Sequence, residues 1–262
     1  SYFIFKTKIK YKSFKEESFK KLKTLFLSLV IILIILFSFS KFYTSFFREH
    51  KSLRFHINPI YWIYSIGNYV NKTLTSGSIV VKETGKDAIV KVDISEKTEI
   101  VIMVVGEAAR ADRFSLNGYK KETNPLLKKE EITNFPNMYS CGTSTAESVP
   151  CMFSIFGKAD YDYKKGISTE NILDVLKHTN DIKILWRDNN SDSKGVALRV
   201  DFEDYRTSKT NTICDEECRD EGMLVGLDEY IKNNQGKDIL IVLHQMGNHG
   251  PAYYKRYPKE FE

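Results

Sequence analysis

Three short segments carry side chains that could do chemistry on a phosphate group. Glu107 follows an apolar run in VVGEAARADRF, Thr145 lies in CGTSTAESVPC, and His249 lies in LHQMGNHGP. A carboxylate delivered by a strand end is a hard ligand for a divalent metal, and a histidine there can bind zinc or phosphate. A hydroxyl with a metal beside it can be activated as a nucleophile toward phosphorus. These residue types therefore point to metal-assisted chemistry on phosphorus.

The same segments also have structural interpretations. Glu107 can be a helix N-cap or a surface acid, and a hydroxyl of residues 143–145 can cap the helix that is predicted to start near Thr145. His244 and His249 can be structural histidines. In favour of a site, the helix dipole and the amides of the first turn would point at an anion bound there. Taken singly, none of the segments decides between the two interpretations.

The four cysteines form two local pairs along the sequence. Cys141 and Cys151 flank one short loop, and Cys214 and Cys218 flank another. In an oxidising compartment both pairs would be disulfides, each contributing about 2–3 kcal/mol by closing its loop. A structural zinc site of four thiolates is the alternative, although Cys141 and Cys151 are further apart than the usual C-x2-4-C spacing.

From residue 99 onward, apolar runs alternate with helical patterns. This alternation predicts an α/β fold with a mostly parallel sheet covered by helices on both faces. In such sheets the active site lies at the C-terminal ends of the strands, which is where Glu107, His244 and His249 occur. The predicted strands are 99–108, 181–188 and 237–246, and the predicted helices are 148–156, 168–179 with Ser168 or Thr169 as N-cap, and 217–234.

A membrane-spanning helix is predicted near the N-terminus. Residues 24–40, TLFLSLVIILIILFSFS, are uncharged and lie between Lys23 and Lys41. About 17–20 helical residues cross a hydrocarbon core of about 30 Å, so this run is just long enough. A signal peptide is the alternative, but no small-residue cleavage site follows. The lysines before the span place residues 1–23 in the cytoplasm and the rest of the chain outside, which in a bacterium is the periplasm.

The charge distribution argues against nucleic-acid binding. The net charge is +5, but residues 1–23 alone carry eight Lys and two Glu. Removing these from the 39 basic and 34 acidic residues leaves 31 against 32, so the rest of the chain has no basic character. A composition of 42% hydrophobic and 13% aromatic residues also argues against intrinsic disorder.

These patterns divide the chain into four parts. Segment 52–74 mixes Tyr, Trp and Ile with few charges, which suits a helix at the membrane surface. The chain starts at Ser1 and stops at Glu262 within a charged, aromatic run, so we expect it to be incomplete at both ends. The predicted parts are a basic cytoplasmic segment (1–23), a transmembrane helix with its juxtamembrane segment (24–47), an interfacial segment and linker (48–98), and the N-terminal part of a catalytic domain (99–262).

Five longer motifs occur in a fixed order. They are GEAARADRFSLNGY, SCGTSTAESVPCMFS, LWRDNNSDSKGV, CRDEGMLVGLDEYI and HQMGNHGPAYYKRYP. In this order they resemble the motifs of bacterial phosphoethanolamine transferases that modify lipid A or lipooligosaccharide, including polymyxin-resistance enzymes. Those enzymes belong to the alkaline phosphatase and sulfatase superfamily. The resemblance covers residues 52–262 and implies a fold of that superfamily.

The resemblance implies roles for individual residues. Thr145 matches the family's nucleophile, beside the metal, and Glu107 matches a zinc ligand. His249 matches a substrate-side or second-metal histidine, and Asp160 lies where some relatives have Glu. A lysine and an amide make physical sense beside phosphate oxygens. The residues expected around the phosphoethanolamine group are Thr143, Asn190, Ser191, Lys194, His249 and Asp160.

The resemblance also implies a reaction, a cofactor and a location. A phosphoethanolamine group would pass from phosphatidylethanolamine to Thr145 at a Zn²⁺ site, and then to lipid A or another lipopolysaccharide acceptor at the inner membrane. The family's remaining zinc ligands lie in a later DHGES-like motif, and no such motif occurs before Glu262. We therefore expect residues 1–262 alone to be inactive and poorly stable.

Other functions stay open at this point. A phosphoglycerol transferase or a sulfatase of the same superfamily is one alternative, although CGTSTAESVPC lacks the C/S-x-P-x-R pattern of formylglycine sulfatases. A non-catalytic, membrane-anchored periplasmic binding domain is another, since the missing metal ligands allow it.

Overall fold

The structure is a computed structural model of the chain, and it divides into two compact units, residues 1–75 and 76–262. Each unit is described by itself. The N-terminal part of the predicted cytoplasmic segment and two stretches of the predicted linker lie outside the described residues. The described residues are 13–75, 79–91, 98–215, 217–250 and 253–261.

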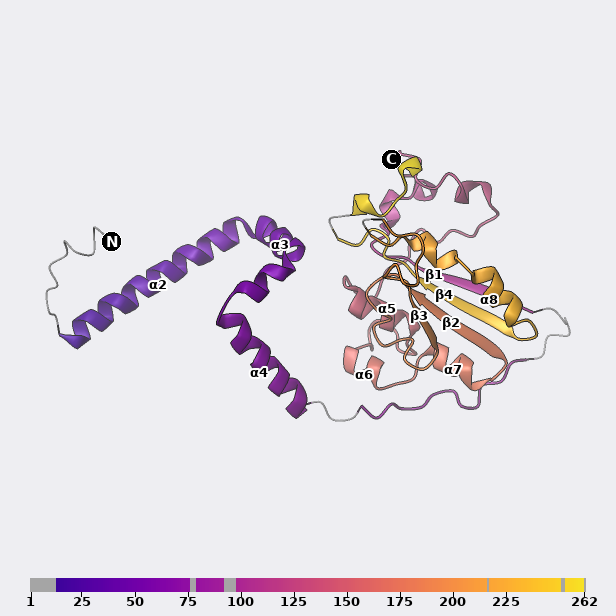
Figure 1. The fold of residues 1–262 in the computed structure, drawn as a ribbon, viewed down its shortest axis with the longest axis horizontal. Helices are drawn as coiled ribbons and strands as arrows, with labels where there is room; N and C mark the ends of the chain where they lie inside the picture. Colours follow the sequence, from indigo (N-terminus) through magenta and orange to yellow (C-terminus); the bar gives the residue numbers. More distant parts are fainter. Residues whose placement is uncertain (1–12, 76–78, 92–97, 216, 251–252, 262) are drawn as a thin grey trace. The chain divides into compact units, whose positions relative to one another are not determined.

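Among the described residues, helices are more numerous than strands, and Figure 1 shows their arrangement within each unit. The α-helices are α2 (Phe14–Ser38), α3 (Ser40–Glu49), α4 (Ile60–Thr75), α5 (Thr145–Phe153), α6 (Tyr163–Ile167), α7 (Ile172–His178) and α8 (Leu227–Asn233). The strands are β1 (Ile100–Val105), β2 (Ile182–Asp188), β3 (Asp201–Asp204) and β4 (Asp238–His244). The 3-10 turns are η1 (Lys51–His56), η2 (Ala111–Arg113), η3 (Ser115–Asn117), η4 (Leu127–Lys129), η5 (Asp220–Leu224), η6 (Tyr253–Lys255) and η7 (Lys259–Phe261).

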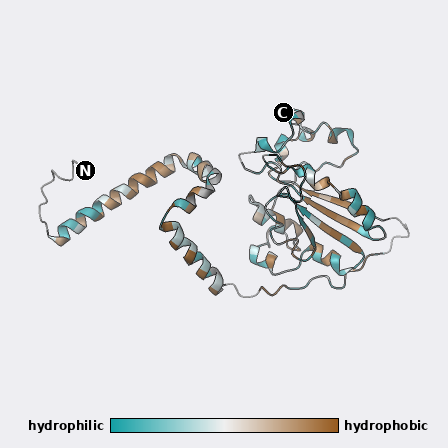
Figure 2. Ribbon diagram, viewed as in Figure 1, coloured by the Kyte–Doolittle hydropathy of each residue, from teal (hydrophilic) through white to brown (hydrophobic). Residues whose placement is uncertain are grey.

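Helix α2 of the first unit is 25 residues long, and none of them is buried. Its apolar stretch stands out in Figure 2, and by length and composition the helix can cross a membrane. The helix begins at Phe14, before the apolar run, because the Ser13 hydroxyl accepts a hydrogen bond from the amide of Glu16 and caps the first turn. Residues 24–38 of the predicted span thus form the second part of a longer helix, whereas Ser40, at the end of the predicted span, begins α3.

The predicted interfacial segment folds into η1 and then α4. On α4 the side chains of Trp62, Ile63 and Tyr64 are all exposed. Exposed aromatic and aliphatic side chains on one helix agree with a position at a lipid surface, which stays a prediction.

Four parallel strands of the second unit form one sheet in the order β1-β4-β2-β3. The register pairs His244 of β4 with Val105 of β1 on one side and with Asp188 of β2 on the other, and Asp188 pairs with Asp204 of β3. The strands therefore end at one level. Whatever follows each strand meets the others at this edge of the sheet.

Helices cover both faces of the sheet, as the α/β pattern predicts. Val149 and Phe153 of α5, with Leu173 of α7, pack on one face against Trp186 and Val242. The opposite face is covered by η5 and α8, and its buried side chains are Tyr205, Met223, Leu227, Ile239, Ile241 and Leu243. The predicted fold class is confirmed.

Strand β1 is the least covered part of the sheet. Its residues 100–104 are apolar and between 39% and 55% exposed, whereas Val105 at its end is 3% exposed. β1 pairs with β4 on one edge only. The poor stability expected of residues 1–262 alone stays a prediction, and these exposed apolar side chains support it.

Three predictions about individual elements were wrong or incomplete. Helix α7 starts at Ile172 with Asn171 as N-cap, not Ser168 or Thr169, because Asn171 and Asp174 form a capping box. The predicted helix 217–234 is broken into η5 and α8, since Gly226 takes a left-handed conformation with φ of 71°. Strand β3, with the polar sequence DFED, was not predicted.

Candidate active site

The loops that follow the strand ends bring together residues from distant parts of the sequence. Glu107 follows β1, Asn190 follows β2, and Gln245 follows β4. The Asn190 side-chain amide donates to Glu107 Oε2 at 3.2 Å and to the Gln245 carbonyl at 2.9 Å. One side chain therefore ties the loop after β2 to both neighbouring loops.

Thr145 and Glu107 are in direct contact. The Thr145 hydroxyl donates a hydrogen bond of 2.7 Å to Glu107 Oε2. Thr145 is the first residue of α5, and the N-cap is Ser144, whose side chain makes no capping hydrogen bond. The threonine hydroxyl thus points at a carboxylate rather than capping the helix. The amides of the first helical turn lie beside it, so the position favours a bound anion.

The loop before α5 is held close to the helix. A disulfide joins Cys141 to Cys151, which lies within α5. A Cβ at Gly142 would come within 2.6 Å of the Glu147 side chain, so the loop backbone lies close to a side chain of the first turn. Thr143 lines a cavity of about 340 Å³ together with Glu107 and Thr145. This placement supports the prediction that Thr143 contacts the substrate.

A chain of polar contacts continues from Asn190 to a lysine. The Ser191 hydroxyl donates to Asn190 Oδ1 at 3.0 Å, and the Lys194 ammonium donates to Ser191 Oγ at 2.5 Å. Lys194 also pairs with Asp192 at 3.4 Å. Lys194 has a φ of 52°, a left-handed conformation that the DNNSDSKG loop imposes on it. Three of the six residues predicted around the phosphoethanolamine group, Asn190, Ser191 and Lys194, thus form one connected set beside Glu107.

His249 lies on the other side of Glu107. Its Nδ1 is 3.6 Å from Glu107 Oε1, and its side chain is 49% exposed. Asp160, in contrast, has only local contacts among those described: its amide donates to the Gly157 carbonyl and its own carbonyl accepts from Lys165. Nothing in these contacts brings Asp160 to the cluster, and its role stays a prediction.

His244 is separated from His249 by the fold. His244 has no exposed surface, and its Nδ1 lies 2.8 Å from Asp188 Oδ2, which also accepts from Trp186 Nε1 at 3.0 Å. The structural interpretation therefore holds for His244. The burial of His244 could have been predicted from strand alternation. Its side chain points to the same face of β4 as the buried Leu240 and Val242.

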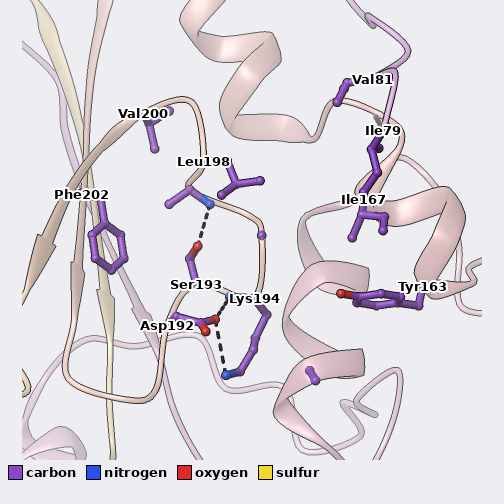
Figure 3. Close-up of a pocket in the computed structure, with 13 residues that line it drawn as sticks. Ile79, Val81, Tyr163, Ile167, Asp192, Ser193, Lys194, Leu198, Val200 and Phe202 are labelled. Atoms are coloured by element: carbon purple, nitrogen blue, oxygen red, sulfur yellow. Dashed lines mark hydrogen bonds and ion pairs between the residues drawn. The ribbon is translucent and has the colours of Figure 1, made fainter. Parts of the chain in front are cut away.

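An apolar cavity of about 840 Å³ adjoins the polar set (Figure 3). Ala146, next to Thr145, and Lys194 both line it. Figure 3 shows Asp192, Lys194 and Leu198 on one side of the cavity and Ile79, Val81 and Ile167 on the other. The remaining lining residues are Ile79, Tyr163, Ile167, Ser193, Gly195, Ala197, Val200 and Phe202.

The donor set for a metal is small. Among the described residues, no group of three or more His, Cys, Asp or Glu side chains could hold an ion. Glu107 and Thr145 nevertheless place a carboxylate oxygen and a hydroxyl oxygen in direct hydrogen-bond contact. Both oxygens could become ligands of one Zn²⁺ if the metal replaced the proton between them. The cysteines are not available as zinc ligands, because Cys214 and Cys218 are also joined in a disulfide.

Two family models match the chain. Residues 99–262, which include the whole cluster around Glu107, match the model described as Sulfatase. The chain belongs to the sulfatase family. Residues 1–74 match the model described as Phosphoethanolamine transferase EptA/EptB. The resemblance to phosphoethanolamine transferases, predicted from the five motifs, is thereby confirmed at the level of the family.

Individual relatives in the sulfatase family are named as phosphatidylethanolamine or phosphoethanolamine transferases. The chain is 48% identical over 267 residues to the phosphatidylethanolamine transferase Mcr-1 of Escherichia coli, covering 97% of this chain and 49% of that protein. It is 39% identical over 237 residues to the phosphoethanolamine transferase EptA of Escherichia coli K12, covering 89% and 43%. The chain thus spans about half the length of the curated relatives it matches.

A solved structure has the same fold. The integral membrane lipooligosaccharide phosphoethanolamine transferase A of Neisseria meningitidis aligns with a TM-score of 0.67 at 35% identity, over 97% of this chain and 47% of that one. The alignment of its soluble domain has a TM-score of 0.65 at 38% identity, over 70% and 55%.

Two residues in or beside the cluster were not predicted from the sequence. One is Gln245, whose backbone carbonyl accepts from Asn190, and a backbone acceptor leaves no side-chain signal. The other is Asn189, which precedes Asn190, is buried and donates to the Cys218 carbonyl and to Asp220 outside the cluster. Both act across loops that only tertiary folding brings together.

Proposed function

We propose that the protein to which this chain belongs transfers phosphoethanolamine from phosphatidylethanolamine to lipid A or a related lipopolysaccharide acceptor, with Thr145 as the nucleophile. The contact that carries this proposal is the 2.7 Å hydrogen bond from Thr145 Oγ1 to Glu107 Oε2. It sets a hydroxyl at a helix N-terminus against a carboxylate, with the Asn190, Ser191 and Lys194 set beside it.

The first half of the reaction forms a bond from Thr145 Oγ to the donor phosphorus and breaks the bond from phosphorus to the diacylglycerol oxygen. The hydroxyl proton leaves on the Glu107 side, where the hydrogen bond already points, and diacylglycerol departs as its oxygen takes up one proton from solvent, so that no net proton is gained or lost. In the second half an acceptor oxygen, from a phosphate or a sugar hydroxyl, displaces Thr145, which regains a proton.

The cluster can stabilise the charge that develops on the transferring group. The Lys194 ammonium and the first-turn amides of α5 are donors for phosphoryl oxygens. Zn²⁺ bound by Glu107 and Thr145, together with ligands from elsewhere, would act as a Lewis acid that favours the ionised threonine. His249 lies within reach of the same group on the Glu107 side.

The apolar cavity supports a lipid as the donor. It begins beside Ala146 and Lys194, next to the proposed nucleophile, and continues between aliphatic side chains. A ligand with a phosphate at one end and hydrocarbon at the other matches this sequence of polar and apolar walls. A water-soluble donor would leave the aliphatic part of the cavity without a function.

The location proposed is the inner membrane with the catalytic part in the periplasm. Helix α2 can span a membrane, and both cysteine pairs are disulfides, which persist in oxidising compartments. Modification of an acceptor with ethanolamine would offset negative charge at the cell surface. Weaker binding of cationic peptides such as polymyxin would follow.

The test is intact mass spectrometry of the full-length gene product purified with zinc and incubated with phosphatidylethanolamine. A phosphoethanolamine adduct is expected on the peptide that contains Thr145. Thr145→Ala should lose the adduct and lower transfer by about 10³-fold or more, because the nucleophile is gone.

Thr145→Ser is the matched control, since it keeps a hydroxyl at the same position and should retain part of the adduct. An adduct that persists in Thr145→Ala would assign the nucleophile elsewhere. No adduct on zinc-replete, donor-saturated wild-type protein would favour a binding domain or a sulfatase-type hydrolase.

A further inference from the structure

Asp220 is an acidic residue outside the Glu107 cluster that accepts hydrogen bonds from two of its loops. It is the first residue of η5, close to the Cys214–Cys218 disulfide. Its Oδ1 accepts from the Met246 amide at 2.8 Å, and its Oδ2 accepts from the Gly247 amide at 2.9 Å. Both amides belong to the segment that follows β4. A carboxylate is a strong acceptor for two successive backbone donors.

The segment held by Asp220 lies against Glu107. The Asn248 amide donates to the Glu107 carbonyl at 3.2 Å. A Cβ on Gly247 would come within 3.0 Å of the same carbonyl oxygen, and Gly247 has a φ of 45°. The backbone of residues 246–248 therefore packs directly on the backbone of Glu107, and His249 follows at once.

Asp220 also reaches the loop after β2. Its Oδ1 accepts a second hydrogen bond, of 2.9 Å, from the side-chain amide of Asn189. That amide donates to the Cys218 carbonyl as well, at 3.0 Å. The next residue, Asn190, is the one that contacts Glu107.

The strand pairing does not reach these loops. The ladder between β2 and β4 ends at Asp188 and His244, and one further backbone bond runs from the Asn189 amide to the His244 carbonyl. Beyond that point the Asp220 carboxylate is bonded to both loops at once. Removal of its charge would loosen both, while the sheet below keeps its register.

We propose that Asp220 is a positioning residue for the transfer reaction: it holds the loops after β2 and β4 so that Asn190 and His249 stay in place around Glu107. Asp220 makes no contact with the reacting atoms. The inference rests on the proposed function for its kinetic part and on the geometry of Glu107 for its metal-binding part.

The test compares Asp220→Asn with wild type in the full-length gene product. Asparagine keeps the shape and one acceptor oxygen, but its NH₂ group faces the Gly247 amide, so one loop contact becomes repulsive. The expected result is a fall in kcat of about 10- to 100-fold with little change in KM for the donor. Zinc affinity, measured by competition with a chelator, should fall about 10-fold.

Two further variants separate positioning from mere stability. Asp228→Asn makes the same chemical change at an exposed position of α8 and should change neither kcat nor zinc affinity. Asp220→Glu keeps the carboxylate, and it should retain more activity than Asp220→Asn at equal thermal stability, because a charged acceptor can still reach one loop.

The proposal would be overturned if Asp220→Asn kept the wild-type kcat and zinc affinity. It would also be overturned if the loss of activity across the three variants simply followed their loss of thermal stability, measured as Tm. If wild-type protein transfers no phosphoethanolamine, the proposed function fails, yet the zinc measurement still tests Asp220. A normal zinc affinity in Asp220→Asn would then overturn the positioning role.

Discussion

The rim and the core of the sheet each hold a carboxylate next to a histidine, in opposite surroundings. At the rim, Glu107 and His249 are 3.6 Å apart, and their side chains are 16% and 49% exposed. In the core, Asp188 and His244 are 2.8 Å apart, and neither has exposed surface. A carboxylate paired with a histidine thus lies at the proposed site in one place and in the interior of the fold in the other.

The difference lies in whether a ligand can reach each carboxylate, since Asp188 Oδ1 has no hydrogen-bond partner among the described residues but is fully buried. In the core, Asp188 Oδ2 is used by His244 and Trp186, and no solvent reaches the pair. At the rim, Glu107 accepts from Thr145 and Asn190 and still faces a cavity. Accessibility, rather than residue type, therefore separates the candidate site from a structural pair.

The largest expected contrast in activity and stability comes from replacing each of the two carboxylates by its amide. Glu107→Gln should lower transfer on the order of 10³-fold and leave stability nearly unchanged, because a neutral amide cannot hold the metal or the threonine proton. Asp188→Asn should instead lower the free energy of unfolding by about 1–3 kcal/mol, since it disturbs a fully buried polar pair. Transfer assays and urea unfolding of each variant measure the two effects.

Both variants are nearly isosteric with wild type, so each serves as the control for the other. A loss of stability in Glu107→Gln equal to that in Asp188→Asn would erase the distinction between rim and core. Full activity in Glu107→Gln would contradict its place in the site.

A smaller effect is expected at the rim histidine. His249→Gln should lower transfer by about 10- to 100-fold with no change in Tm, because the imidazole is half exposed and contacts only the edge of the cluster. His178→Gln, in a third carboxylate–histidine pair on α7, is the matched control and should leave transfer unchanged. Equal transfer rates for the two variants would remove His249 from the proposed site.

The third pair, Glu170 with His178, gives the smallest effect and depends on pH. Burial opposes ionisation of Glu170, but hydrogen bonds from His178 Nε2 and the Thr84 amide, each 2.8 Å, outweigh it. The pKa of Glu170 therefore lies below its ordinary value. Because the folded-state pKa is the lower one, this contribution to stability is complete above about pH 4.3 and is lost as the pH falls through the folded-state pKa.

Urea unfolding of wild type and Glu170→Gln between pH 6 and pH 3 measures this contribution. The difference in midpoint should be largest at pH 6 and should shrink toward pH 3. A difference that grows on acidification would reverse the sign of the shift and place the stabilising form of Glu170 in its protonated state.

Much of the fold could be predicted from the sequence, because its signals are local. Apolar runs at residues 99–105, 182–188 and 238–244 specify buried parallel strands whatever their order in the sheet. Local cysteine pairs, together with the predicted oxidising compartment, favour the disulfides Cys141–Cys151 and Cys214–Cys218. The break at Gly226 was missed, since a glycine inside a helical pattern does not reveal whether its φ will be positive.

The sequence by itself determined which residue types stand at strand ends and helix starts, because periodicity and motif order act over a few residues. Only the tertiary structure decided that Thr145 contacts Glu107 and that Asn190 bridges Glu107 and Gln245. It also decided that His244 is buried in the core while His249 lies at the rim. The contacts of Glu107 with Thr145 and with Asn190 join segments 38 and 83 residues apart. The register of the parallel strands sets the geometry of these contacts. That register depends on several segments of the chain at once, so no single segment specifies it.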